Sequence, residues 1–314
     1  MTIDTAAFER YRRSPNDKTN LLRLFFGTAI TVAFWVATTL LVLLGGTYAF
    51  LLWRARIGAG LPGGRPVQDF LASPEGVLTA LLSFAGIWIG LWVAMRFLHA
   101  EPLAALFGAS RRISWAGFLN GLIAVLITSL LSEILLYWLQ PEIARGPISL
   151  SSWLLFLAPI VALTLLQTSS EEALFRGYLL RGLASRYGNP LIWAGVPLLL
   201  FTALHWSSAS SLAINACVLV SIAAFALVLT LLVHATGNLG AAFGAHLGNN
   251  LTGFLLISHQ ESYNAFALFT ARPLEGPGWT TWDAVLIAAI GIVSSLLTAL
   301  LLLHPRSPLK IGPA

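Results

Sequence analysis

Long apolar runs separated by short polar stretches dominate the chain. A membrane-spanning helix needs about 20 mainly apolar residues, and eight stretches of the sequence meet or approach that length. We expect spans near residues 24–52, 76–98, 113–139, 152–182, 190–207, 211–234, 238–258 and 282–304. The first stretch is overlong, and Gly45-Gly46 is a candidate break within it. The pattern predicts an all-α, polytopic membrane protein of about eight transmembrane helices, and ionisable residues within the spans predict a buried polar cavity.

The composition supports a membrane protein rather than a soluble enzyme. The chain is 57% hydrophobic and 10% charged, whereas ordinary soluble domains are about 25% charged. Its single cysteine, Cys217, lies within a predicted span. An intramolecular disulfide is therefore excluded, and a small hydrophobic core residue is a better interpretation of Cys217 than a thiol nucleophile.

The positions of the basic residues predict the orientation of the chain, because cytoplasmic loops carry an excess of Lys and Arg. With eight spans and the N-terminus inside, thirteen of the 18 Lys and Arg residues fall on the inner side. Both termini are therefore expected to be cytoplasmic. The net charge of +5 is explained by this topology and by the anionic headgroups of the lipid bilayer. No loop is long enough to form a nucleic-acid-binding face.

We expect one integral membrane domain over residues 21–305. Residues 1–20 are interpreted as a charged, partly disordered cytoplasmic arm, and residues 306–314 as a cytoplasmic C-terminal tail. Residues 54–75 and 259–281 are rich in Gly and Pro and are predicted to be external loops.

Three polar clusters lie in or beside the predicted spans. Ionisable groups inside a membrane cost roughly 2.5–3.5 kcal/mol each on insertion scales, so they are usually functional. Together the clusters contain carboxylates, a guanidinium, imidazoles and a carboxamide, which are the groups that a hydrolase uses. The clusters are Glu171-Glu172-x-x-x-Arg176, Phe201-x-x-x-His205 and His246-x-x-x-Asn250.

The spacing of the first two clusters suggests that they meet. Gly188 lies in a predicted turn, and Glu171 and His205 are each 17 residues from it. In an antiparallel helical hairpin both residues would lie at the same depth, roughly 25 Å from the turn. We therefore expect Glu171 to face His205.

The third cluster is expected on a helix that has a polar face and a packing face. His246 and Asn250 are four residues apart and share one face. Gly240, Gly244 and Gly248 recur every four residues on a different face, and small residues at this period allow close helix packing in lipid. The helix should dock through its glycines and present His246 and Asn250 to a cavity.

Within the first cluster, an ion pair is predicted between Glu172 and Arg176, which are four residues apart. Such a pair would leave Glu171 free to point elsewhere. Glu133 is a further carboxylate inside a predicted span, nearer its outer end. We interpret Glu133 as a hydrogen-bonded structural acid that could line a cavity.

The three motifs, in this order on successive apolar helices, resemble the CPBP family. This family contains CaaX prenyl endopeptidases and bacteriocin-processing and self-immunity proteins, and is also called the ABI family. The resemblance covers about residues 113–258 and implies an eight-helix intramembrane protease in which the first glutamate activates water. It assigns Glu171 as general base with His205 as its neighbour, and it gives oxyanion stabilisation to His246 and Asn250. It gives structural support of the site to Glu172 and Arg176.

A metal site is an open alternative. Glu171, His205 and His246 could supply three zinc ligands with an open fourth position. However, the local His-Glu-x-x-His spacing of zinc proteases is absent. We favour water activated by glutamate without a metal or other cofactor, and zinc stays as the alternative.

The leading functional hypothesis is an intramembrane endopeptidase for a peptide or membrane-protein substrate, with CaaX-type or peptide-precursor processing as candidate reactions. The alternative is a non-proteolytic scaffold or immunity protein that uses the same cavity to bind a peptide or partner helix. A proton-coupled transporter would also explain buried Glu and His, but the sequence shows no repeat of the kind expected for one.

Overall fold

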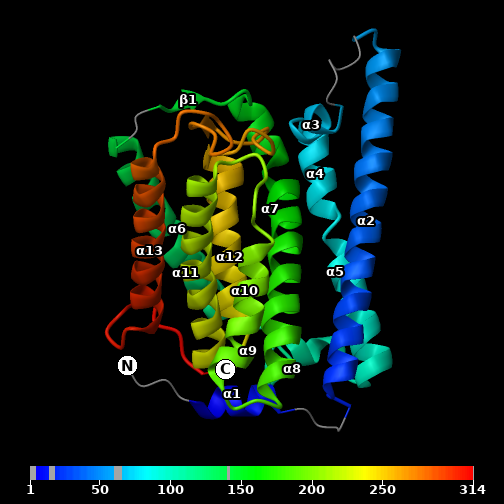
Figure 1. The fold of residues 1–314 in the computed structure, drawn as a ribbon, viewed down its shortest axis with the longest axis vertical. Helices are drawn as coiled ribbons and strands as arrows, with labels where there is room; N and C mark the ends of the chain where they lie inside the picture. Colours follow the sequence, from blue (N-terminus) through cyan, green and yellow to red (C-terminus); the bar gives the residue numbers. More distant parts are fainter. Residues whose placement is uncertain (1–4, 14–17, 60–65, 140–141, 314) are drawn as a thin grey trace.

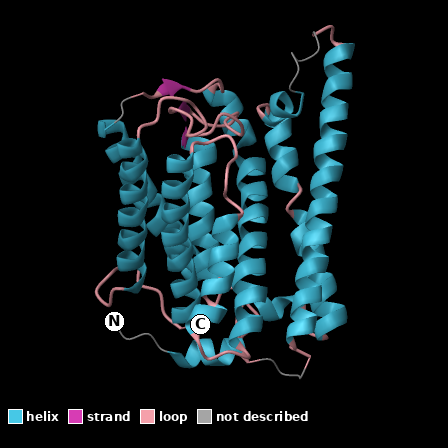
Figure 2. Cartoon of the chain, in the orientation of Figure 1, coloured by secondary structure: helices cyan, strands magenta, loops and turns pink. Residues whose placement is uncertain are grey.

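A computed structural model describes residues 5–13, 18–59, 66–139 and 142–313. Within these ranges the chain is a bundle of long helices, and strands occur only as short pieces at one end (Figures 1 and 2). Six helices of the described part are long and apolar enough to cross a membrane. The prediction of an all-α, polytopic membrane protein is therefore confirmed.

The centre of the bundle is built around the helix that carries the third motif. This helix, α12, packs against α6 and α7, and α11 packs along α13. The bounds are α6 Trp115–Leu139, α7 Leu150–Glu172, α11 Leu212–Thr236, α12 Gly240–Leu251 and α13 Thr281–Leu303. After α7 the helical run continues through the π-helix η3, Ala173–Leu179, into α8, Leu180–Ala184.

A second, peripheral group lies at the side of the bundle (Figure 1). The long helix α2 packs along α4 and α5, and α5 continues as the π-helix η1. The bounds are α2 Leu21–Arg56, α3 Pro66–Leu71, α4 Pro74–Leu82, α5 Ala85–Val93 and η1 Ala94–His99. Part of the predicted external loop 54–75 is thus helical, and residues 60–65 lie outside the described residues.

The predicted break at Gly45-Gly46 is wrong, because α2 continues through it. A Cβ atom on Gly46 would come within 2.6 Å of the Phe70 ring on α3. Glycine at this position therefore provides a close approach between two helices rather than a helix end.

Two of the eight predicted spans are shorter than expected. The span predicted at 190–207 consists of α9, Pro190–Trp193, and α10, Gly195–Ala203, with an irregular residue between them. Pro197 explains this interruption, because proline lacks the N–H that would bond to the Trp193 carbonyl and its ring crowds that carbonyl. The span predicted at 238–258 is α12 followed by the π-helix η4, Thr252–Leu256.

A small sheet covers one end of the bundle (Figure 2). Strand β3 pairs with β1 in antiparallel orientation and with β2 in parallel orientation. The strands are β1 Ala144–Arg145, β2 Ile257–Ser258 and β3 Phe269–Thr270. The predicted external loop 259–281 therefore contains one strand of this sheet.

The predicted N-terminal arm contains a helix. Residues Thr5–Arg12 form helix α1 at the opposite end of the bundle from the sheet (Figure 1), and they bury Ala7, Phe8 and Tyr11. The Tyr11 hydroxyl donates a hydrogen bond of 2.8 Å to the carbonyl of Leu106, the last residue of the 3₁₀ helix η2, Leu103–Leu106. Burial raises the pKa of Tyr11, so the phenol stays protonated and able to donate.

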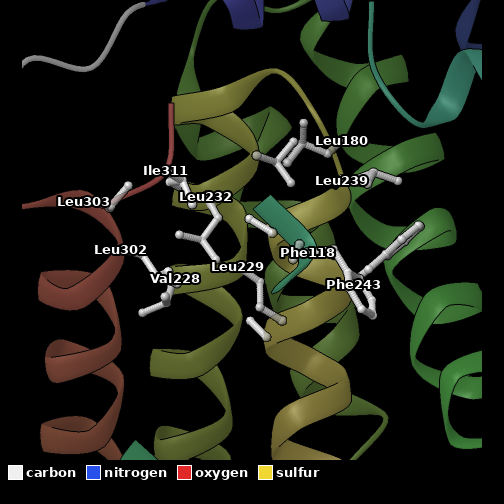
Figure 3. Close-up of a cluster of buried hydrophobic side chains, with 14 of the residues drawn as sticks. Phe118, Leu180, Val228, Leu229, Leu232, Leu239, Phe243, Leu302, Leu303 and Ile311 are labelled. Carbon is white, nitrogen blue, oxygen red and sulfur yellow. The ribbon is translucent and has the colours of Figure 1, made fainter. Parts of the chain in front are cut away.

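The core joins the central helices to both ends of the described chain. Buried hydrophobic side chains from α6, α8, α11, α12 and α13 pack together in one cluster (Figure 3). Phe8 of α1 and Ile311 of the predicted C-terminal tail belong to the same cluster. The Ile311 N–H also donates to the Leu302 carbonyl at 2.9 Å, so the tail folds back on the bundle near α1.

Candidate active site

The first motif forms a buried ion pair where α7 passes into the π-helix η3. Arg176 Nη1 lies 2.9 Å from Glu172 Oε1, and both side chains are almost fully excluded from solvent. The guanidinium also stacks 4.4 Å from the centre of the Phe201 ring and donates to the Ala226 carbonyl at 3.3 Å. The predicted Glu172–Arg176 pair is therefore present, and π-helical turns of this kind are frequent at functional sites.

His246 of α12 joins this pair from the opposite side. Its Nδ1 atom lies 2.8 Å from Glu172 Oε1, and its Nε2 atom lies 3.7 Å from Glu171 Oε2. The imidazole is therefore placed between the two neighbouring carboxylates. The sequence did not predict this contact, because it depends on how α12 is docked.

Glycines set that docking. A Cβ atom on Gly240 or Gly244 would collide with the backbone carbonyl of Ser114 or Phe118 of the α6 segment. A Cβ on Gly248 would come within 3.0 Å of the Leu122 carbonyl. The predicted packing face is confirmed: α12 lies so close to α6 that its other face, with His246, is held against α7.

Glu171 has a different environment from Glu172. Its side chain is 12% exposed, whereas that of Glu172 is fully buried. Glu171 Oε1 accepts a hydrogen bond of 3.2 Å from Gln167 Nε2. Its Oε2 atom is buried and, like Oε2 of Glu172, has no hydrogen-bond donor within the described part of the chain. Glu171 therefore keeps an acceptor site at the edge of the centre.

Gln167 connects the first motif to the third. Asn250 Nδ2 donates to Gln167 Oε1 at 3.2 Å, and Gln167 in turn donates to Glu171. Asn249 Nδ2 donates to Asn250 Oδ1 at 3.1 Å. The sequence analysis missed Gln167, although its position four residues before Glu171 places it on the same helix face.

His205 lies beside Phe201. It is exposed, and no hydrogen bond or ion pair joins it to Glu171 among the residues that the structure describes. Its Nδ1 atom lies 2.8 Å from the Phe201 carbonyl, and its ring lies 4.7 Å from the Phe201 ring, which also contacts His246. Helix α10 ends at Ala203 and is separated from α9, so the equal depth of Glu171 and His205, which assumed one unbroken helix, stays a prediction.

The zinc alternative required Glu171, His205 and His246 to converge. In the described ranges no group of three or more His, Cys, Asp or Glu side chains is arranged to hold a metal ion. Among the described residues, the ion-pair contact within this set joins Glu171 and His246 at 3.7 Å.

Glu133 lies apart from this centre, toward the end with the sheet. It accepts a hydrogen bond of 3.1 Å from His259 Nε2, and both residues line a cavity of about 130 Å³. The interpretation of Glu133 as a hydrogen-bonded acid beside a cavity is therefore confirmed.

Comparisons with known proteins concern the same part of the chain. Residues 151–252 match the family model described as type II CAAX prenyl endopeptidase Rce1-like. The uncharacterized protein YyaK of Bacillus subtilis (strain 168) is 27% identical over 209 residues, which are 65% of this chain and 68% of that protein. No solved structure matches.

The family match contains all three motifs, from Glu171 to Asn250. It is narrower than the range 113–258 expected from the motifs, and at the level of the family it supports an intramembrane protease. The resemblance predicted from the motifs is confirmed: residues 151–252 are similar to the Rce1-like type II CAAX prenyl endopeptidases.

Proposed function

We propose that this protein is a membrane-embedded endopeptidase in which Glu171 activates water. The observation that supports this most directly is the difference between the two neighbouring carboxylates. Glu172 is fully buried and engaged by Arg176 and His246. Glu171 is 12% exposed at the edge of the centre, and its Oε2 atom, like Oε2 of Glu172, has no donor among the described residues. Glu172 is thus suited to hold the architecture, and Glu171 to accept a proton.

The proposed reaction begins with a water molecule beside Glu171 Oε2. Glu171 takes one proton as the water oxygen attacks the carbonyl carbon of the scissile peptide bond. The carbonyl oxygen becomes an oxyanion in the tetrahedral intermediate, and the second hydrogen of the Asn250 amide is available to stabilise it. The intermediate collapses as the carbon–nitrogen bond breaks and Glu171 returns its proton to the leaving amine. The products are a carboxylic acid and an amine.

His246 has a positioning role in this proposal rather than the oxyanion role implied by the resemblance. Both ring nitrogens of His246 face carboxylates, so neither is directed toward a substrate oxyanion. His205 stands at the exposed side of Phe201. Because the Phe201 carbonyl accepts from Nδ1, the Nε2 atom of a neutral His205 is an acceptor that can exchange protons with water or substrate.

The Rce1-like match favours a CaaX-type tail as the substrate, with a peptide precursor or membrane-protein segment as the wider class. We propose that no metal or other cofactor is required. We also propose that both termini are cytoplasmic, because the ends of the described chain lie at the same end of the bundle (Figure 1) and because of the distribution of Lys and Arg.

The test compares membranes from cells that make the wild-type protein, the Glu171→Gln variant or the Glu133→Gln variant at equal abundance. New protein termini are mapped by mass spectrometry. Glutamine keeps the shape and hydrogen-bonding capacity of glutamate but cannot take the proton. Glu133→Gln is the matched control, because it removes a carboxylate from a predicted span outside the proposed centre.

Termini that are present with wild type and Glu133→Gln but absent with Glu171→Gln would support proteolysis and would identify the substrate. If Glu171→Gln leaves every terminus in place, the protease proposal fails. If it also retains the phenotype that deletion of the gene removes, the scaffold or immunity alternative is favoured instead.

A further inference from the structure

A cavity of about 280 Å³ lies beside helix α1, which is at the end of the bundle opposite the sheet (Figure 1). It does not share a lining residue with the proposed active site. Its walls come from α1, from the segment between η1 and α6, and from α8. The charged and polar residues that matter here are Arg10, Tyr11, Arg13, Glu101, Arg111 and Arg181.

Arg181 holds the inner wall of the cavity. It is 9% exposed, and its Nη2 atom donates to Glu101 Oε2 at 2.9 Å. Its Nε atom donates to the Tyr11 carbonyl at 3.1 Å. The buried guanidinium therefore ties α8 to α1 and to the segment after η1, so that the inner wall is fixed in shape.

The outer wall is fixed by Asn238. This buried side chain donates from Nδ2 to the Arg112 carbonyl at 2.8 Å and accepts the Ser114 N–H at 3.0 Å. Asn238 also forms an antiparallel backbone β-bridge with Gly108. Arg111 lies in the chain between Gly108 and Arg112, and its backbone φ is +58°. A non-glycine residue is rarely left-handed unless its surroundings hold it so, and such positions cluster at binding sites.

The charge balance of the cavity is strongly positive. Four guanidiniums line it, against the single carboxylate of Glu101, which is paired with Arg181. Within the described ranges no carboxylate forms a salt bridge with Arg10, Arg13 or Arg111, and all three are exposed. Several guanidiniums around one cavity are the arrangement that recognises phosphate oxygens, because each can donate two parallel hydrogen bonds.

We propose that this cavity binds a phosphate-type anion, with Arg13 and Arg111 as ligands and Arg181 as the buried support. Two sources have this chemistry: the headgroup of an anionic lipid and a soluble phosphate. The location favours a source at the membrane surface that the Lys and Arg distribution predicts to be cytoplasmic. The site is independent of the proposed hydrolysis, so it can be tested without a known peptide substrate.

The experiment uses the full-length protein purified in a neutral detergent. Retention of phosphatidylglycerol and of phosphatidylcholine is compared by native mass spectrometry, and inorganic phosphate is titrated at constant ionic strength with thermal unfolding as the readout. The test variant is Arg13→Gln with Arg111→Gln. The matched control is Arg96→Gln with Arg112→Gln, which removes two exposed arginines outside the cavity.

Wild type and the control are expected to bind the anion equally, and the test variant roughly tenfold or more weakly. Retention of phosphatidylglycerol alone would identify a lipid headgroup, and a saturable effect of phosphate alone would identify a soluble anion. Equal losses in the test and control variants would indicate diffuse surface charge and would overturn the proposal, as would no binding by wild type. Unfolding temperatures measured without ligand check that the variants fold. Arg10→Gln, a single substitution of an exposed arginine that lines the cavity, provides a second test variant.

Discussion

His246 places its Nδ1 atom 2.8 Å from Glu172 Oε1, the same oxygen that accepts a hydrogen bond from Arg176. A carboxylate oxygen only accepts, so Nδ1 of His246 carries the proton. In the neutral ring Nε2 is then an acceptor, and it is directed toward Glu171 at 3.7 Å. Glu172 therefore determines the tautomer of His246 and, through it, which nitrogen faces the proposed base.

This relationship predicts different outcomes for two substitutions of His246. Glutamine can still donate to Glu172 but cannot place a ring nitrogen beside Glu171, so His246→Gln should misplace the proposed base and lower the cleavage rate by about 10²-fold with little change in unfolding temperature. His246→Leu should lower both the cleavage rate and the unfolding temperature, because it leaves Glu172 without one of its two donors. The rates and unfolding temperatures of both purified variants test this, and a His246→Gln variant with wild-type activity would contradict it.

The ion pair between Glu172 and Arg176 should contribute strongly to the stability of the folded protein. Arg176→Met leaves the Glu172 carboxylate without its cation, and breaking a buried pair in this way costs about 3–5 kcal/mol. Unfolding in detergent measures the loss, with the exposed Arg112→Met as control. Adding Glu172→Gln to Arg176→Met should recover part of the loss, because the uncompensated charge is then removed. Strictly additive effects of the two substitutions would show that the residues are not coupled.

Local spacing predicted the parts of the site that depend on one helix. The Glu172–Arg176 pair follows from residues four apart, and the docking face of α12 follows from the glycine period. The helix start at Pro190 was also predictable, because proline suits the first helical position. In the structure the Asn189 side chain caps this start and accepts the Leu191 N–H at 3.0 Å.

The parts that local spacing does not determine depend on long-range geometry. The equal depth of Glu171 and His205 assumed an unbroken helix, and Pro197 interrupts it. The contact of His246 with Glu172 depends on how closely α12 docks on α6, which no spacing rule provides. Gln167 is neutral and was not conspicuous among the ionisable residues, although it connects Asn250 to Glu171.

The close contact of α12 with α6 predicts that Gly244 is sensitive to even one methyl group. A Cβ at this position would meet the Phe118 carbonyl oxygen, which belongs to the backbone and cannot rotate away. Gly244→Ala should therefore destabilise the protein by about 1–3 kcal/mol and reduce cleavage by displacing His246. Gly253→Ala is the control, because a Cβ there meets no atom within 4 Å. Equal unfolding temperatures for the two variants would refute the tight packing.

The docking of α1 should depend on pH through Tyr11. Burial raises the pKa of this phenol above its ordinary value of about 10, so the folded state binds the proton more tightly than the unfolded state. The stability that Tyr11 contributes is therefore complete at neutral pH and is lost as the pH rises above about 10. Hydrogen exchange of the α1 amides, measured across this range, should show α1 loosening at high pH.

Tyr11→Phe should loosen α1 already at neutral pH, because the Leu106 carbonyl loses its donor. It should also remove the part of the pH dependence that comes from the Tyr11 phenol. Tyr48→Phe, an exposed change on α2, should do neither. If wild type and Tyr11→Phe give the same exchange profile at every pH, Tyr11 does not hold α1 in place.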